Sequence, residues 1–178
     1  NNGNVDSSQT LTQLVAAIQA AGGPTYEWRQ IDPVNGQDGG APGGNIRQVF
    51  LFRTDRGLSF VDRPGGDSAT PNAVVGSGAT THLQYSPGRI DPASSAWAAS
   101  RKPLAGEFDY RGHKLFVIAN HFNSKGGDDP LRGRFQPPNA VTEVQRHQQA
   151  HEVADFVSGI SAADPGANVV VLGDLNDF

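Results

Sequence analysis

The fold of this chain is decided by its last stretch, Asn168-Val169-Val170-Val171-Leu172-Gly173-Asp174-Leu175-Asn176-Asp177-Phe178. The aliphatic run at residues 169–172 is typical of a strand that is buried on both faces of a sheet. Asp174 and Asn176 follow it two positions apart, so on an extended chain their side chains point the same way. A carboxylate and a carboxamide placed together can bind a hard cation and orient a water or a phosphate oxygen. Asp and Asn are also common in the turns that follow strands, which is the simpler interpretation.

Length and composition suit one domain, or most of one, because the chain has 178 residues. Its 22 glycines and 12 prolines indicate compact elements joined by long loops. Methionine is absent and the chain begins with Asn1, so we expect an internal or processed segment of a longer gene product. Cysteine is absent too, which excludes disulfides and zinc–thiolate sites. No apolar run is long enough to cross a membrane.

The charge is distributed unevenly along the chain. A net charge of −4 excludes a wholly basic nucleic-acid binder. Residues 101–134 nevertheless carry seven of the fourteen Lys and Arg residues and only four acids, so this segment is +3 and the remainder is −7. A basic segment beside an acidic metal site suits a polyanionic substrate. The alternative is a solvated hairpin with ordinary surface charge.

Periodicity and turn residues predict an alternation of helices and strands. Helices are expected at about residues 7–21 and 141–160, the second with a core-facing stripe. The stripe residues are Ala150, Val153, Ala154, Val157 and Ile160. Strands are expected at residues 26–31, 46–53, 58–61, 104–109, 114–119 and 169–172. The connection at residues 62–100 is predicted to be long and irregular.

The strand at 114–119, the following helix and the strand at 169–172 form a strand–helix–strand crossover. Such a unit makes its two strands parallel neighbours in one sheet. Asn120 and His121 follow the first strand, and Asp174 and Asn176 follow the second. These four residues should therefore meet at one sheet edge, where open α/β sheets bind ligands.

The chemistry that this edge indicates is metal-assisted attack of water on a phosphodiester. A metal ion, an imidazole and basic side chains can stabilise the negative charge of the transition state. Asp174 would hold the metal or orient the water, Asn176 would position the reacting oxygen, and His121 would donate a hydrogen bond to a non-bridging oxygen. Lys125, near the same edge, and Asn120 are candidates for contact with substrate phosphate.

The chain resembles the endonuclease/exonuclease/phosphatase superfamily, also called DNase I-like, and within it the secreted bacterial nucleases. The resemblance is carried by Gly173-Asp174-Leu175-Asn176 after an apolar strand, with Asn120-His121 ending an earlier one. Residues 50–56, 120–127, 143–150 and 173–177 add to it. The segment Ser100-Arg101-Lys102-Pro103-Leu104 resembles the Arg-x-Pro segment that faces the phosphate backbone in this superfamily.

This resemblance implies a four-layer α/β/β/α sandwich that here lacks its first and last strands, so that residues 1–178 form a single partial domain. It implies an extracellular enzyme that hydrolyses DNA or RNA with Mg²⁺, Mn²⁺ or Ca²⁺. It implies that His121 binds phosphate and that Asp174 binds the metal ion and orients the water. It implies that Asn176 positions the reacting oxygen and also binds the metal ion. Arg101 would contact phosphate.

The superfamily pattern also contains a metal-binding glutamate on an early strand and a late Asp–His pair. No residue of this chain can be assigned either role, so we expect this segment alone to be inactive or weak. One alternative is a phosphatase or lipid phosphodiesterase of the same fold. Another is a non-catalytic module that keeps the fold and holds an anionic ligand at the same edge.

Overall fold

The computed structural model describes residues 5–39 and 45–177 and has the mixed helices and strands of the α/β class. Its α-helices are α1 (Ser8–Ala20) and α2 (Glu143–Ala163). Its strands are β1 (Tyr26–Gln30), β2 (Val49–Arg53), β3 (Leu58–Val61), β4 (Val74–Val75), β5 (His82–Leu83), β6 (Gly88–Arg89), β7 (Leu104–Tyr110), β8 (His113–His121) and β9 (Asn168–Asp174). Within these ranges, no helix has the length and apolar character needed to cross a membrane.

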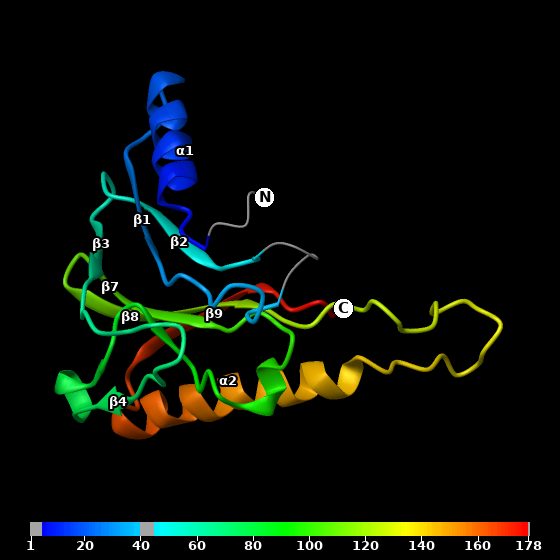
Figure 1. Cartoon of the computed structure of the whole chain (residues 1–178). Helices are drawn as coiled ribbons and strands as arrows, with labels where there is room; N and C mark the ends of the chain where they lie inside the picture. Colours follow the sequence, from blue (N-terminus) through cyan, green and yellow to red (C-terminus); the bar gives the residue numbers. More distant parts are fainter. Residues whose placement is uncertain (1–4, 40–44, 178) are drawn as a thin grey trace.

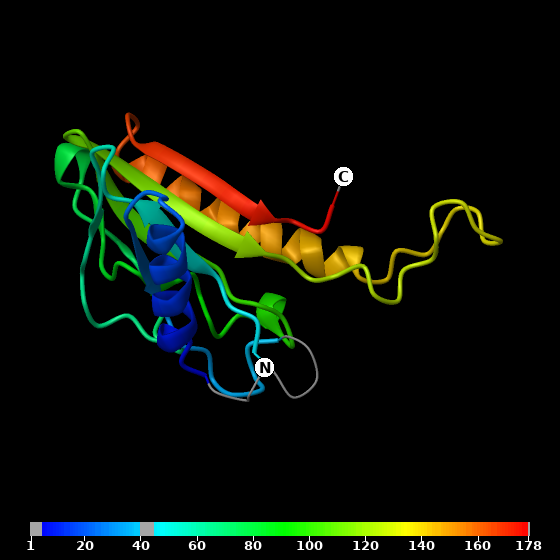
Figure 2. The same cartoon turned by 90° about the horizontal axis from the view of Figure 1, so that it is seen from above.

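The centre of the molecule is a five-stranded sheet. Its strands run in the order β3-β7-β8-β9, and β6 pairs with β7 outside that path. Strands β7 and β8 form an antiparallel hairpin, whereas β9 is parallel to β8, from Leu115 opposite Asn168 to His121 opposite Asp174. Helix α2 connects β8 to β9 and lies along one face of the sheet (Figure 1). The predicted crossover is therefore confirmed, and the carboxyl ends of β8 and β9 reach the same edge (Figure 2).

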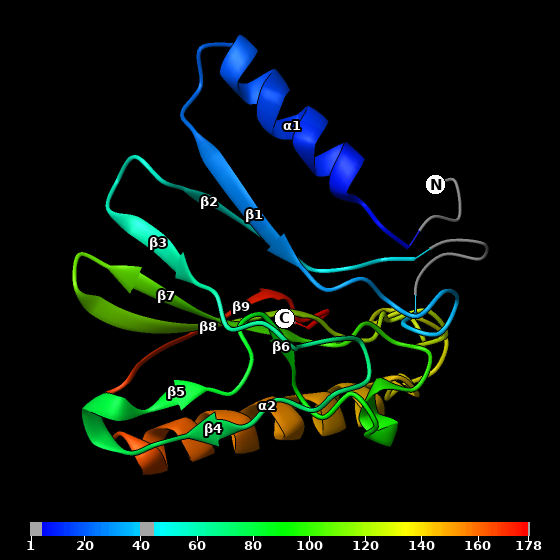
Figure 3. The same ribbon diagram turned by 60° about the vertical axis from the view of Figure 1, so that its left-hand side comes forward.

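Each face of this sheet has its own apolar core, because successive β8 side chains point to opposite faces. Phe116 and Ile118 face α2, whereas Val117 and Ala119 face the β1–β2 ribbon. The core beneath α2 contains Leu83, Ile90, Trp97, Ala105, Phe116, Ile118, Phe122, Val153 and Ile160. The core beneath the ribbon contains Ile31, Phe50, Phe52, Leu104, Phe108, Val117 and Ala119. Helix α1 lies on the side of the β1–β2 ribbon that faces away from the central sheet (Figure 3).

The prediction that the last strand is buried on both faces is wrong. Val170, Val171 and Leu172 are 38–46% exposed, and only Val169 of the aliphatic run is partly buried. The reason is position: β9 pairs with β8 on one side, and within the part of the chain that the structure describes no strand pairs with its other side. The doubly covered strand is β8, whose residues from Phe116 to Asn120 are all buried.

Helix α2 is rotated relative to its predicted stripe. Ala150 and Ala154 are exposed, and Arg146 and Gln149 are buried together with Val153 and Ile160. These two polar side chains can be buried because both find hydrogen-bond partners.

The connection at residues 62–100 is not wholly irregular. It contributes β4, β5 and β6 and two short 3₁₀ helices, Gly78–Thr80 and Ser95–Trp97. Strand β2 begins three residues later than the sequence predicts, at Val49.

Candidate functional site

The carboxyl ends of β8 and β9 form a rim, which we define as residues 120–122 and 173–177. His121 is the last residue of β8, Asp174 is the last of β9, and the two are opposite each other in the strand register. The His121 Nε2 and Asp174 Oδ2 atoms lie 3.7 Å apart. The structure thus brings together the imidazole and the carboxylate that the sequence predicts to meet, from positions 53 residues apart along the chain.

Asn176 reaches the rim through a turn and not through an extended chain. Strand β9 ends at Asp174, and Asn176 has a φ of 50°. The Asp174 carboxylate accepts the main-chain N–H of Asn176 through Oδ1 at 2.9 Å, which is the pattern of an Asx turn. The expectation that both side chains point the same way along a strand is therefore wrong in its geometry. The turn still holds the carboxamide at the rim, because Asn176 Nδ2 donates to the Phe122 carbonyl at 2.9 Å.

Arg101 lies directly behind the rim. Its Nη2 donates to the same Phe122 carbonyl at 2.6 Å, so one main-chain oxygen ties Arg101 to Asn176. Only 7% of Arg101 is exposed. Burial lowers the pKa of Arg101, and the negative charge of Asp174 acts in the opposite direction. The guanidinium therefore supplies positive potential from beneath the rim.

Asn120 is buried as well, at 3% exposure. Its Nδ2 donates to the carbonyls of Ile118 at 3.0 Å and Leu172 at 3.2 Å, which links β8 to β9 just before both strands end. Its Oδ1 has no hydrogen-bond partner among the described atoms. This geometry makes Asn120 a positioning residue for the rim and gives it little surface for direct contact with a phosphate.

Lys125 lies at the edge of the rim, as the sequence predicts. Its Nζ is 3.9 Å from Asp177 Oδ1, and its side chain is 33% exposed. Asp177 is thus a second acid close to the candidate site, and its role as a partner of Lys125 is not deducible from the motif.

Two glutamines that sequence reasoning missed hold the rim in place. Gln149 is fully buried in α2, where its Nε2 donates to Ser100 Oγ at 2.9 Å and its Oε1 accepts the N–H of Asn123 at 2.7 Å. It therefore fixes both the segment before Arg101 and the chain that leaves β8. Gln48, also buried, accepts the main-chain N–H of His121 at 3.1 Å when its amide nitrogen faces the Lys102 carbonyl. Gln48 belongs to no motif, and Gln149 lies in the segment 143–150 that adds to the resemblance but was given no role there.

The electrostatic surroundings keep the His121 ring neutral. Burial is the main cause that lowers the pKa of His121, and the Arg101 cation lowers it further, whereas Asp174 raises it. The net pKa lies below the ordinary histidine value of 6.5. At pH 7 the imidazole is therefore uncharged, with one N–H to donate and one nitrogen lone pair to accept.

The rim offers only part of a metal shell. The Asp174 side chain is 62% exposed, and the Asn176 amide nitrogen is engaged by Phe122, which leaves its oxygen as a donor to a cation. Across the described ranges no three His, Cys, Asp or Glu side chains cluster closely enough to hold a metal ion. Mg²⁺ typically keeps several waters and binds through one or two carboxylates plus substrate phosphate. The donors at the rim fit an ion held in that way and do not form a closed cage.

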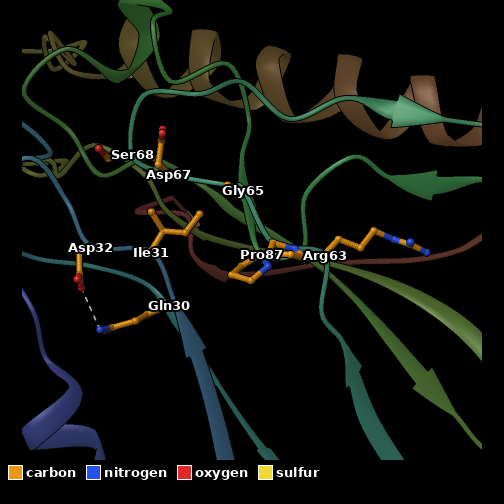
Figure 4. Close-up of a pocket in the computed structure, with 10 residues that line it drawn as sticks. Gln30, Ile31, Asp32, Arg63, Gly65, Asp67, Ser68 and Pro87 are labelled. Carbon is orange, nitrogen blue, oxygen red and sulfur yellow. Dashed lines mark hydrogen bonds between the residues drawn. The ribbon is translucent and has the colours of Figure 1, made fainter.

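A separate pocket of about 330 Å³ lies between the end of β1 and residues 63–68. Figure 4 shows Gln30 donating to Asp32, at 3.0 Å, and the Arg63 side chain directed away from the other labelled residues. Arg63 pairs with the buried Glu107 at 3.2 Å. Gln30, Asp32 and Arg63 thus already have partners, and none of the residues that line this pocket belongs to the rim.

Comparisons with family models, with curated proteins and with solved structures found no match to this chain.

Proposed function

We propose that this chain is part of a divalent-metal-dependent phosphodiesterase that hydrolyses nucleic acid, and that the rim is its active site. The supporting observation is the approach of His121 to Asp174, at 3.7 Å, on the carboxyl edge of two parallel strands. Ligands of open α/β sheets bind at such edges. Arg101 beneath the rim and Lys125 beside it supply the positive charge that a phosphodiester requires.

The proposed fold is the four-layer α/β/β/α sandwich of the DNase I-like superfamily. Support comes from the order of layers, with α1 outside the β1–β2 ribbon and α2 outside the central sheet (Figure 3). Two separate cores, one on each face of the sheet, fit this arrangement. The family and the extracellular location are proposed on the sequence motifs alone.

In the proposed mechanism, Asp174 and the Asn176 carboxamide oxygen would hold Mg²⁺ or Mn²⁺. The bound ion would supply Lewis-acid stabilisation and a more acidic water. The neutral His121 ring donates its N–H to a non-bridging phosphate oxygen. From beneath the rim, Arg101 stabilises the negative charge that develops on that phosphate. Lys125 leaves its contact with Asp177 and binds a neighbouring phosphate of the substrate.

The basic segment favours nucleic acid as the substrate over a phospholipid or a sugar phosphate. Of the seven basic residues in the segment 101–134, Arg101 and Lys125 lie at the rim, and Arg132 and Arg134 lie on the loop that follows it, which suits a substrate with repeated phosphates. The alternative of a non-catalytic module is favoured by one observation, the lack of a three-ligand metal cluster in the described part of the chain. The two proposals differ in whether anion binding depends on a divalent ion.

The test is the binding of a fluorescent oligonucleotide, measured by anisotropy with Mg²⁺ and then with EDTA. We expect binding about tenfold tighter with Mg²⁺, a difference of about 1.4 kcal/mol. Asp174→Ala should remove that difference, and Asp155→Ala, which changes an exposed acid of α2, should keep it. Metal-independent binding that Asp174→Ala leaves unchanged would favour the non-catalytic module. Faster hydrolysis of phospholipid than of DNA in parallel assays would favour the lipid phosphodiesterase.

A further inference from the structure

Residues 128–140, between β8 and α2, form an arm that projects beyond the body of the molecule (Figure 1). It leaves the same end of the sheet at which β8 and β9 terminate (Figure 2). Six residues, 122–127, separate His121 from the start of the arm at Asp128. The arm is therefore placed to meet a long substrate that lies across the rim.

The base of the arm is fixed by its two acids. The Asp128 carboxylate accepts the Thr142 N–H and the Thr142 hydroxyl, both at 2.7 Å, and pairs with buried Arg146 at 3.2 Å. Asp129 donates its N–H to the Asn139 carbonyl and accepts the Asn139 N–H through its carboxylate, both at 3.0 Å. The Asp128 carboxylate is thus neutralised by Arg146, and the Asp129 carboxylate is hydrogen-bonded within the base of the arm.

The tip of the arm, residues 131–136, is positively charged, whereas the two acids lie at the base. Arg132 and Arg134 are exposed, and in the part of the chain that the structure describes neither forms an ion pair with an acid. Leu131 is 62% exposed and Phe135 is 51% exposed. The Arg134 guanidinium lies 4.5 Å from the centre of the Phe135 ring.

The tip also has a defined shape. Gln136 Nε2 donates to the carbonyls of Leu131 at 3.2 Å and Gly133 at 3.3 Å, which closes the chain into a compact turn. Two cations and two large apolar side chains thus stand on a loop whose base is anchored, although they make no contribution to either core. Exposed arginines beside an exposed aromatic ring match the two chemical faces of a nucleic acid, its phosphates and its bases.

We propose that the arm is a nucleic-acid clamp, in which Arg132 and Arg134 bind backbone phosphates and Phe135 packs against bases or sugars. This inference rests on the proposed function of the rim and extends it to a second contact on the same strand. A membrane surface is the competing partner for such a tip. It is disfavoured because interfacial anchors need a broader apolar face than Leu131 and Phe135 provide.

The test compares duplex binding by arm variants and a charge-matched control, with the metal chelated by EDTA. The double variant Arg132→Gln/Arg134→Gln should lower affinity at least tenfold and reduce the slope of log affinity against log salt by about 2, because each phosphate contact adds about 0.9 to that slope. Phe135→Ala should lower the affinity for a single-stranded oligonucleotide about 5- to 150-fold with an unchanged slope, since stacking of a base on an aromatic ring is worth about 1–3 kcal/mol. The control Arg56→Gln/Arg111→Gln removes the same charge from turns at the opposite end of the sheet and should change the slope little.

The outcomes separate this proposal from the proposed function. Arm variants that bind duplex with wild-type affinity and slope overturn the clamp, even if Asp174→Ala still abolishes the Mg²⁺ effect. Arm variants that weaken duplex binding support the clamp, even if Asp174→Ala has no effect and the rim proposal fails. Loss of binding to vesicles of phosphatidylserine and phosphatidylcholine, with duplex binding intact, would overturn the clamp in favour of a membrane contact.

Discussion

Gly173→Ala is the substitution that most sharply tests how the rim is built. Gly173 lies just before Asp174 and has a φ of 125°, a backbone conformation that residues with a side chain rarely adopt. A Cβ atom at this position would be 2.0 Å from the Asn120 carbonyl oxygen and 2.8 Å from the Asn120 nitrogen. The neighbouring atoms are backbone of β8, so they can yield only if the two strands separate locally.

The expected cost follows from two contributions. A non-glycine residue in this conformation costs about 1–3 kcal/mol. Separation of the strands at Asn120 and Gly173 loses at least one ladder hydrogen bond, worth about 0.5–1.5 kcal/mol. We therefore expect Gly173→Ala to lower the free energy of unfolding by about 2–4 kcal/mol. For a chain of this size that corresponds to a fall in Tm of about 5–15 °C.

The assay is urea unfolding followed by far-ultraviolet circular dichroism. The matched control is Gly159→Ala in α2, where a Cβ would meet nothing closer than Val74 Cγ2 at 3.9 Å. Because alanine favours the helix by about 1 kcal/mol over glycine, this control should leave stability unchanged or raise it. A Gly173→Ala protein with the unfolding midpoint of the wild type would refute the described pairing of β8 with β9 at the rim.

Further predictions concern the core and the arm. Ile160→Ala should lower the free energy of unfolding by about 2–5 kcal/mol in the same urea assay, because Ile160 is fully buried beneath the sheet; a loss below 1 kcal/mol would contradict that packing. The hydrogen bonds from Thr142 hold the pKa of Asp128 below its ordinary value, so the anchoring of the arm is fully present above about pH 4 and is lost as the pH falls through the lowered pKa. The protection factor of the Thr142 amide, which corrects the exchange rate for its intrinsic pH dependence, should therefore fall over that acidic range in the wild type and should be low at every pH in Asp128→Asn; equal protection factors in both proteins would refute the anchoring role.

The crossover could be predicted from the sequence because its signals are local. An apolar strand, a long amphipathic helix and a second apolar strand dictate parallel neighbours, and this is enough to bring His121 to Asp174. The β7–β8 hairpin was predictable for the same reason, since Gly112 and its neighbours mark the turn between two apolar runs.

Burial was less predictable because it depends on what covers an element. The run at residues 169–172 has the composition of a central strand, but β9 is paired on one side within the described structure. In α2 the alanines looked apolar enough to face the core, yet Gln149 is buried in their place because three hydrogen-bond partners surround it. Periodicity cannot anticipate partners that come from loops far along the chain.

The sequence predicts which of these residues meet at the rim better than it predicts the geometry in which they meet. Asn176 reaches the rim through a positive φ and a carbonyl shared with Arg101, and neither feature follows from a two-residue spacing. Gln48 contacts His121 from a segment that carries no motif. These contacts arise from tertiary packing, which a short motif does not encode.

Binding of a divalent ion at the rim through Asp174 can be measured by paramagnetic broadening in ¹H–¹⁵N spectra of the chain titrated with Mn²⁺. At substoichiometric Mn²⁺ we expect selective loss of the amide signals of residues 120–123 and 173–177 in the wild type, and retention of those signals in Asp174→Ala. Broadening centred elsewhere on the molecule, or broadening at the rim that Asp174→Ala leaves unchanged, would contradict binding of the ion through Asp174.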